Sequence, residues 1–358
     1  MARYIIREAD QNDISGIIRL RHTIRVFRSI ETAEYDSFWN SLISSNPSSI
    51  RHIFVGVNEK KEIVAHVAMV PFRFLRDGEP LIGGLLCQLM VHEAFRQELL
   101  FPRLEMKILS GYQARGFDFS FILANRGDVK KAHISLGFHD IGDLVVYAMP
   151  YKLSGITRRV IKNGLLNSIM MPIRFIAEGL LRLKRSSGKC ASSATEISRF
   201  DSSIDQFLVE VQKYFPYTAV RNSAILNWRF SNDNSMKYQI LVIKEDSEIV
   251  GYVVLRRIDM KGFDVLAIAD ILFSPARIDV GRSLINAVHR KAVQLGVEMS
   301  ACLLNPNDPL CSIIRKCGYI KTPEVFSLIV HEPKDKTRHF GKDTFAKWHL
   351  TWFDHDVV

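Results

Sequence analysis

Titratable side chains that could exchange protons stand at two places in the first half of the chain. His92 and Glu93 follow a predicted strand at 81–91, and His133 lies in a predicted helix at 128–136. An imidazole has an ordinary pKa near 6.5, so it can donate or accept a proton near neutral pH. These side chains are candidates for acid–base catalysis, although His92 and Glu93 could equally cap a loop and His133 could be an ordinary surface histidine.

Metal chemistry is not indicated. Five cysteines are scattered along the chain, and no two of them form a CxxC pair. This pattern argues against a disulfide framework and a zinc site, so we expect reduced, mostly buried thiols. The histidines and aspartates of 348–356 alternate without the spacing of metal-ligand pairs, and we interpret 333–358 as a docking tail. The cysteines are Cys87, Cys190, Cys302, Cys311 and Cys317.

The elements that would position these residues occur in the same order twice. Glu62-Ile63-Val64-Ala65 matches Glu248-Ile249-Val250-Gly251, and Leu136-Gly137-Phe138 matches Cys317-Gly318-Tyr319. Hydrophobic periodicity therefore predicts tandem copies of one fold. The first copy has strands at 3–8, 52–58, 62–74, 81–91, 118–124 and 143–150 and helices at 13–28, 33–45, 101–115 and 128–136. The second has strands at 195–201, 239–245, 247–260, 263–273, 298–305 and 325–332 and helices at 203–215, 223–230, 279–295 and 308–318.

A basic segment separates the two copies. Residues 151–190 hold nine basic side chains and one acid, so this stretch carries most of the net charge of +10 and leaves the copies nearly neutral. Its apolar residues recur at helical spacing, which predicts an amphipathic linker helix across 151–194. The helix could pack between the domains, or 155–189 could contact a membrane surface. Near-neutral copies argue against a nucleic-acid partner.

Three segments of the first copy resemble one known superfamily. Residues 6–14 are similar to its first strand and helix start, 89–96 to its fourth strand and the following loop, and 125–138 to its fifth strand and the next helix. Together with the element order, they resemble the GNAT acyl-CoA N-acyltransferases. The resemblance covers 1–150 well and 195–332 more weakly. It implies an α+β fold of two tandem GNAT-like domains, each a mixed, mostly antiparallel sheet flanked by helices.

The resemblance also implies where a cofactor would bind. The run Arg96-Gln97-Glu98-Leu99-Leu100-Phe101 stands where the family has Arg/Gln-x-x-Gly-x-Gly/Ala, a loop whose backbone N–H groups hold pyrophosphate at a helix N-terminus. Arg96 fits the pattern, whereas leucine and phenylalanine replace the small residues. An ordinary strand-to-helix turn is the alternative. In the second copy Asp279 would place its carboxylate where an anion would bind, so we expect that copy to be non-catalytic.

Further roles follow from the same resemblance. Backbone amides near Met90 and Val91 would meet the oxyanion, and Asn125 would border the cofactor. His133 stands four residues before Gly137, where the family often has a tyrosine that protonates the departing thiolate. His92 or Glu93 would lie near the general base, and Gln88 could orient the incoming amine.

The predicted function is acyl transfer. The resemblance implies that acetyl-CoA or another acyl-CoA donates its acyl group to a primary amine of a small molecule or cell-surface precursor, bound between the copies. A degenerate, non-catalytic protein that binds a ligand or partner is the alternative, since both copies lack the loop glycines. Because no apolar leader follows Met1, we expect a cytoplasmic protein, with the linker as a possible contact to the inner membrane face.

Overall fold

The computed structural model describes most of both copies. The residues it describes are 4–24, 39, 43, 45–48, 50–152, 193–231, 236–333 and 340–356. The predicted linker helix and its proposed membrane contact at 155–189 lie outside the described residues, as does most of the predicted helix at 33–45. Among the helices that the structure describes, none is long and apolar enough to cross a bilayer.

The elements of the first half follow the predicted order. Strand β4 is two residues longer at its start than predicted, and β6 is four residues longer. The elements are β1 (Tyr4–Glu8), η1 (Gln11–Asp13), α1 (Ile14–Thr23), β2 (His52–Asn58), β3 (Ile63–Arg76), β4 (Glu79–Val91), η4 (Glu93–Glu98), α3 (Leu100–Leu109), η5 (Gln113–Arg115), β5 (Phe119–Ala124), α4 (Gly127–Ser135) and β6 (His139–Pro150).

The second half repeats this order and adds short elements that the sequence did not predict. These are β8, β14 and two 3₁₀ turns near the C-terminus, which are too short to show a hydrophobic period. The elements are β7 (Thr195–Ile197), α8 (Ser203–Gln212), β8 (Tyr217–Ala219), α9 (Ser223–Phe230), β9 (Gln239–Glu245), β10 (Glu248–Met260), β11 (Phe263–Phe273), α10 (Ile278–Leu295), β12 (Met299–Leu304), α11 (Pro309–Lys316), β13 (Ile320–His331), η7 (Lys342–Lys347), β14 (Trp348–His349) and η8 (Trp352–Asp354).

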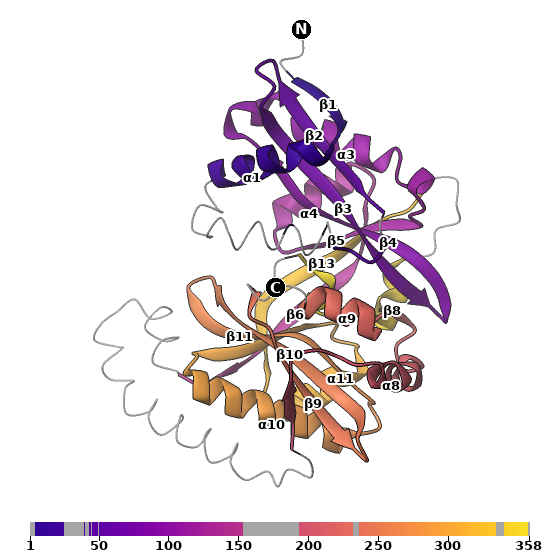
Figure 1. Cartoon of the computed structure of the whole chain (residues 1–358), viewed down its shortest axis with the longest axis vertical. Helices are drawn as coiled ribbons and strands as arrows, with labels where there is room; N and C mark the ends of the chain where they lie inside the picture. The colour runs from indigo at the N-terminus through magenta and orange to yellow at the C-terminus, as the bar shows by residue number, and fades with distance from the viewer. Residues whose placement is uncertain are drawn as a thin grey trace, which may run out of the picture.

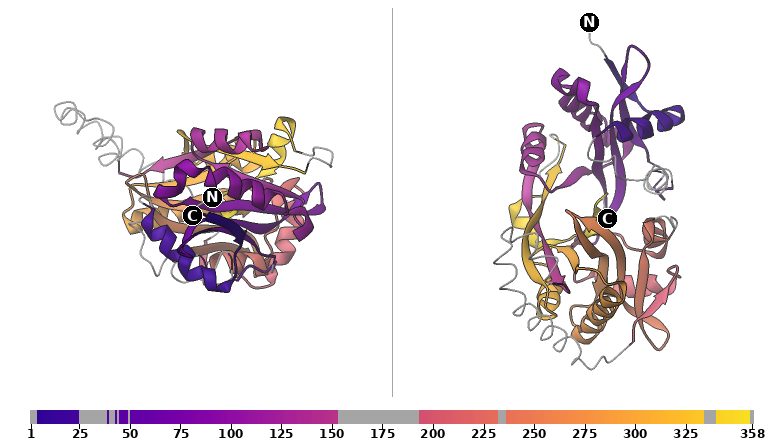
Figure 2. Two further views of the ribbon diagram at one scale, coloured as in Figure 1. Left: turned by 90° about the horizontal axis from the view of Figure 1, so that it is seen from above. Right: turned by 90° about the vertical axis from the view of Figure 1, so that its left-hand side faces the viewer.

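The two halves share one continuous sheet, because each gives its last strand to the other (Figures 1 and 2). The order is β1-β2-β3-β4-β5-β13-β6-β12-β11-β10-β9-β7. Strand β13 from the second half lies antiparallel to β5, and β6 from the first half lies antiparallel to β12. The α+β fold with tandem GNAT-like halves is confirmed, and the halves are joined by strand exchange rather than by the linker alone.

Helices cover both faces of the sheet in the first half. On one face, Ile17 and Leu20 of α1 pack into the larger hydrophobic core. On the other, Leu100, Leu104 and Ile108 of α3 pack into a smaller core. A ligand bound in an opening of this sheet would therefore have α1 on one face and α3 on the other.

The sheet opens at the same place in each half. Strands β4 and β5 pair in parallel over only three positions, from Gly83–Phe119 to Leu85–Phe121, and then diverge. In the second half β11 and β12 pair only as far as Ile268–Cys302. Beyond these points β4 and β11 have a neighbour on one side only, so backbone N–H groups on the other side face a gap. Each gap is a natural position for a ligand.

The C-terminal segment lies between the two gaps. Trp348 and Trp352 are buried, β14 pairs with β8, and η8 contacts β11. Figure 1 shows the C-terminus at the middle of the molecule, where the halves meet. Residues 351–356, which we call the C-terminal strap, therefore lie next to both openings of the sheet.

Candidate functional site

The gap of the first half contains a chain of polar contacts from three separate parts of the sequence. Arg21 of α1 donates to Oε1 of Gln88 at 2.6 Å, and Nε2 of Gln88 donates to Oδ2 of Asp356 at 2.8 Å. Gln88 lies at a bulge of β4, with a left-handed φ of 55° that is uncommon for a residue other than glycine. Such strain is often kept where a side chain must point in one functional direction. Here it directs Gln88 to the strap.

The strap is held from the second half. Arg229 of α9 donates to the carbonyl oxygens of Phe353 at 3.2 Å and His355 at 2.5 Å. Burial lowers the pKa of His355, while Asp356 and a hydrogen bond with the backbone of Leu123 in β5 act in the opposite direction. His355 and Asp356 therefore stand on the β5 side and the β4 side of the same gap.

Strand pairing distinguishes the backbone amides of Met90 and Val91, the two that we expected to face the oxyanion. The N–H of His92 donates to the carbonyl of Val64 at 2.8 Å. Alternate residues of an antiparallel strand point their N–H groups to the same side, so Met90, opposite His66, also faces β3. Val91 then directs its N–H to the side of β5, into the gap. Of the two, Val91 is placed to donate to a ligand there.

His66 supports the bulge from the neighbouring strand. The imidazole is fully buried, and its Nδ1 lies 2.8 Å from the carbonyl oxygen of Gln88. Burial lowers the pKa of His66 to about 4, although the hydrogen bond with Gln88 acts to raise it. A neutral imidazole with Nδ1 protonated can donate this bond. His66 thus holds the Gln88 backbone in place and carries no charge at neutral pH.

The loop after β4 is formed by the 3₁₀ turn η4. His92 caps this turn, because Nδ1 accepts the N–H of Ala94 at 3.3 Å. Glu93 is exposed and 3.8 Å from Arg96. Both therefore have roles as loop residues, one of the two alternatives that the sequence left open, and they lie beyond the end of β4 rather than beside Gln88.

Helix α3 begins with an unusual residue. Leu99 is left-handed, with φ 56° and ψ 26°, and is 63% exposed, so it does not fill a groove. Leu100 is buried and Phe101 is half-buried. First-turn N–H groups have no acceptor inside a helix, and in the described residues those of Leu100 and Phe101 donate to none elsewhere. Pro102 lacks an N–H, so this end of α3 offers fewer anion donors than the family pattern would.

His133 belongs to α4 and its side chain contacts α3. Its Nδ1 is 2.7 Å from Oε1 of Glu105, and the aromatic rings of Phe101 and Phe138 each lie 5.6 Å from the imidazole. The imidazole is 4% exposed, and Glu105 is completely buried. The sequence left open a leaving-group acid or a partly exposed helix histidine, and the structure shows a buried imidazole in contact with a buried carboxyl group.

The remaining predicted residues lie around the same opening. Gln97 is exposed, Glu98 accepts a hydrogen bond from the Tyr4 hydroxyl through its carbonyl at 3.0 Å, and Asn125 is exposed at the end of β5. The structure thus brings Val91, Asn125 and the start of α3 to one end of the gap.

The second half fills its own gap. Arg221 lies 3.0 Å from Asp270 of β11 and 3.1 Å from Asp354 of the strap, and all three side chains are buried. Tyr252 and Thr351 also donate to Asp270, at 2.7 and 2.8 Å. Counted back from the ends of β11 and β4, Asp270 corresponds to Gln88. At the position that corresponds to Gln88, the second half therefore has a buried cluster of charged side chains that bind one another.

The pKa values of the two carboxyl groups in this cluster shift in opposite directions. Burial would raise the pKa of Asp270, but Arg221 and its hydrogen bonds outweigh burial and lower it. For Asp354, burial dominates and the pKa is raised in spite of Arg221. One arginine thus stabilises one ionised carboxylate well and the second only in part.

The phosphate-loop position of the second half is likewise occupied. Arg277 binds Asp279 at 2.7 Å and Glu245 at 2.6 Å. The pKa of Asp279 is lowered, first by its hydrogen bond with Arg277 and also by bonds to backbone N–H groups at the start of α10. Asp279 itself takes the amides that an anion would need.

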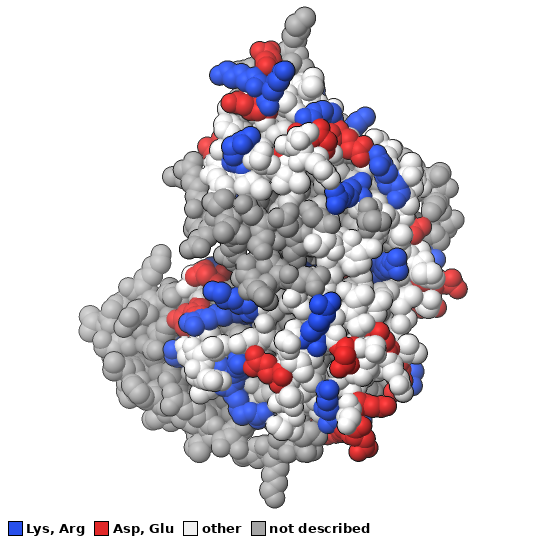
Figure 3. Space-filling model, viewed as in Figure 1, with Lys and Arg blue, Asp and Glu red and all other residues white. Residues whose placement is uncertain are grey.

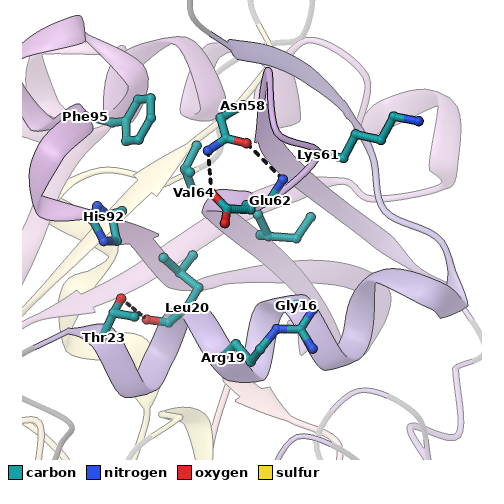
Figure 4. A pocket seen from close by; sticks show the side chains of 11 residues that line it. Gly16, Arg19, Leu20, Thr23, Asn58, Lys61, Glu62, Val64, His92 and Phe95 are labelled. Atoms are coloured by element: carbon teal, nitrogen blue, oxygen red, sulfur yellow. Dashed lines mark hydrogen bonds between the residues drawn. The ribbon is translucent and has the colours of Figure 1, made fainter.

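Each half also has a surface pocket beside its first helix. The pocket of the first half has a volume of about 300 Å³ and is lined by Arg19 and Leu20 of α1, Lys61, His92 and Phe95, among others (Figure 4). The pocket of the second half, about 290 Å³, is lined by the corresponding elements, including Tyr214 and Arg277.

The two pockets differ in charge. In the described residues Arg19 and Lys61 have no ion pair, whereas Arg277 is paired with two carboxylates. Figure 4 shows Glu62 of the first pocket bound to Asn58. Basic and acidic side chains are otherwise interspersed over both halves on the face in Figure 3. No group of three or more metal-ligating side chains occurs within the described ranges.

Part of the chain matches a known protein family. Residues 203–319 match the model of the acetyltransferase (GNAT) family. The second half therefore contains a GNAT-family domain. We expected the resemblance to be stronger in 1–150, and this is wrong, because the family model matches the second half. That half keeps the GNAT sequence pattern while its gap is filled.

Solved structures show the same fold over nearly the whole chain. A GCN5-related N-acetyltransferase from Anabaena variabilis has a TM-score of 0.61 at 10% identity and covers 92% of this chain and 72% of its own. N-myristoyltransferase from Saccharomyces cerevisiae, solved with bound myristoyl-CoA, has a TM-score of 0.64 at 10% identity and covers 98% and 89%. A putative acetyltransferase from Pyrococcus horikoshii gives 0.55 at 13%, with 94% and 92%. No curated protein matches the sequence.

Sequence reasoning missed two residues of this candidate site. Asp356 is 268 positions from Gln88 in the chain, and Glu105 is 28 positions from His133. Asp356 was assigned only to the tail. Glu105 carried a signal, because it interrupts the apolar face of α3 between Leu104 and Ile108, where a buried side chain is expected.

Proposed function

We propose that the first half transfers an acyl group from an acyl-CoA thioester to a primary amine, and that the second half supports this site without catalysing a reaction. The observation that carries the proposal is the difference between the gaps. At the gap of the second half Arg221 pairs with the buried carboxylates of Asp270 and Asp354, whereas at the gap of the first half the neutral amide of Gln88 bonds the carboxylate of Asp356.

The two sides of the sheet divide the substrates. Acyl-CoA approaches from the α3 face, with its phosphates near 96–101 and its thioester between β4 and β5. The amine approaches from the α1 face, where Arg21 holds Gln88. The pocket beside α1 is the place we assign to the body of the acceptor, since His92 on its wall lies four residues, about 13 Å, along the chain from Gln88.

Each side chain then has one task. Gln88 orients the amine, and the Asp356 carboxylate takes the proton that the amine must lose to become a nucleophile. The N–H of Val91 donates to the oxyanion as the nitrogen–carbon bond forms. When the carbon–sulfur bond breaks, His133 gives its proton to the thiolate. This assigns the base to Asp356 rather than to His92 or Glu93, whose side chains are engaged in the loop.

Titration calorimetry with acyl-CoA thioesters of two to sixteen carbons tests the proposal. We expect binding of at least one of them at one site per chain, and release of free CoA when an amine is added. A chain that binds none of these thioesters would instead be the non-catalytic ligand-binding protein that the missing loop glycines suggest.

A further inference from the structure

The carboxylate of Glu105 is buried beside a histidine. Glu105 is 0% exposed, and its Oε1 lies 2.7 Å from Nδ1 of His133. Its second oxygen, Oε2, is enclosed without a hydrogen-bond partner in the described residues. A buried carboxylate is costly unless it is paired, so His133 is the group that makes this position of α3 tolerable.

The contact fixes the orientation of the imidazole. Because Nδ1 faces the carboxylate, it carries a hydrogen and donates it, which leaves Nε2 as the nitrogen available for exchange. Nε2 is not among the enclosed polar atoms, whereas Oε2 of Glu105 is. The rings of Phe101 and Phe138 also contact the imidazole, each with its centroid 5.6 Å away.

The second half shows that the fold does not need this pair. Gly318 corresponds to Gly137, so Ile314 of α11 corresponds to His133. Ile314 is completely buried, and the helix packs with an apolar side chain there. Apolar residues of similar volume usually replace a buried ion pair without loss of stability, so packing alone does not explain Glu105 and His133.

We propose that Glu105 is the positioning residue for His133 in the acyl transfer proposed above, on which this inference rests. Glu105 accepts the Nδ1 hydrogen, stabilises the imidazolium and directs Nε2–H to the departing sulfur. As the carbon–sulfur bond breaks, its electron pair stays on sulfur and the Nε2 proton moves there. The imidazole is left neutral, and Glu105 itself never takes a proton.

Rate measurements on single and double variants test this role. Glu105→Gln keeps an acceptor but removes the charge, so we expect kcat to fall about tenfold to a hundredfold with KM for acyl-CoA unchanged. The alkaline limb of the kcat–pH profile should move to lower pH. His133→Gln should lose more, and the double variant should be no slower than His133→Gln, because Glu105 acts only through His133. Glu196→Gln, in an exposed pair with Lys291, is the matched control and should behave as the native chain.

Two readouts separate this inference from the proposed reaction. Nitrogen NMR of the histidine side chains, with His133 assigned by its loss in His133→Gln, should show Nδ1 protonated in the native chain and a mixture of tautomers in Glu105→Leu. Glu105→Leu/His133→Ile replaces the pair with apolar side chains, the second of them as at Ile314, and should remain folded by circular dichroism. If the native imidazole is protonated on Nε2 alone, or if Glu105→Gln slows the His133→Gln chain further, Glu105 does not position His133. If Nδ1 is protonated but acyl-CoA is not turned over, the proposed reaction is wrong, and so is the role of Glu105 in proton transfer. The hydrogen bond between Glu105 and His133 would still stand.

Discussion

At the scale of single residues, the chemistry depends on side chains that come together from distant positions. Gln88 belongs to the fourth strand, Arg21 to the first helix and Asp356 to the end of the described chain. A strained φ at Gln88 and a neutral His66 behind it maintain this contact. The proposed amine side of the site therefore depends on how these side chains are oriented as well as on their residue types.

Asp356→Asn tests the assignment of the base. An amide has the shape of the carboxylate and can still bond Gln88, but it cannot take a proton from the amine. We expect kcat to fall about a hundredfold or more, with acyl-CoA affinity unchanged, in a CoA-release assay. Asp343→Asn on the exposed turn η7 serves as the control. A kcat within threefold of native would show that another group is the base.

His66 predicts how stability depends on pH. Its folded pKa of about 4 lies below the ordinary 6.5, so the unfolded chain binds a proton that the folded chain excludes. Stability from this group is full above pH 6.5 and falls as the pH drops toward 4, by about 3 kcal/mol in total. Urea unfolding at pH 7 and pH 4.5 measures this.

His66→Phe is the variant for comparison, because phenylalanine cannot bind the proton. Its unfolding free energy should fall less than that of the native chain between the two pH values, whatever its stability at pH 7. An equal fall in both chains would mean that other groups carry the pH dependence.

At the scale of elements, the strap connects the two halves. Thr351 and Asp354 bind the Arg221 cluster of the second half, and Asp356 binds Gln88 of the first. The second half uses its gap to hold the strap, and the strap carries a polar group to the other gap. In the proposed function, the half that matches the GNAT family model thus contributes by holding the strap.

Arg221→Met tests this anchor. Loss of the guanidinium leaves two buried carboxylates without a cation, so we expect a loss of about 3–5 kcal/mol in the free energy of unfolding. Arg277→Met removes an arginine with two carboxylate partners at a 39% exposed position, and we expect less than about 1 kcal/mol. Equal effects in urea unfolding would show that the cluster does not hold the strap.

At the scale of the whole molecule, strand exchange makes the halves interdependent. Strand β5 has β13 from the other half as its neighbour, and β12 has β6. The first half alone would expose the edges of β5 and β6, which normally receive β13.

Expression of separate pieces tests this dependence. We expect residues 1–152 and 193–358 to be insoluble alone and to purify together as one folded complex when co-expressed, by affinity capture and circular dichroism. A folded, monomeric 1–152 fragment with cooperative unfolding would contradict the exchange.

The sequence predicted the positions of helices and strands better than it predicted which strands are neighbours in the sheet. Periodicity predicted 223–230, 239–245 and 263–273 with the bounds that the structure has. Exchange was not predictable, because β6 and β13 are both apolar closing strands and nothing in either pattern specifies its neighbour. The turn between β4 and α3 lies where the sequence predicted it, but the Gln88–Asp356 and Glu105–His133 contacts depend on tertiary packing that spacing does not encode.

A crystal structure of the chain with acetyl-CoA tests the central claim most directly. We predict one molecule per chain, with its thioester between β4 and β5 near the N–H of Val91 and its phosphates at 96–101. The gap between β11 and β12 should remain filled by Arg221, Asp270 and Asp354. Acetyl-CoA bound between β11 and β12, with the strap displaced, would contradict the assignment of the first half as the catalytic one.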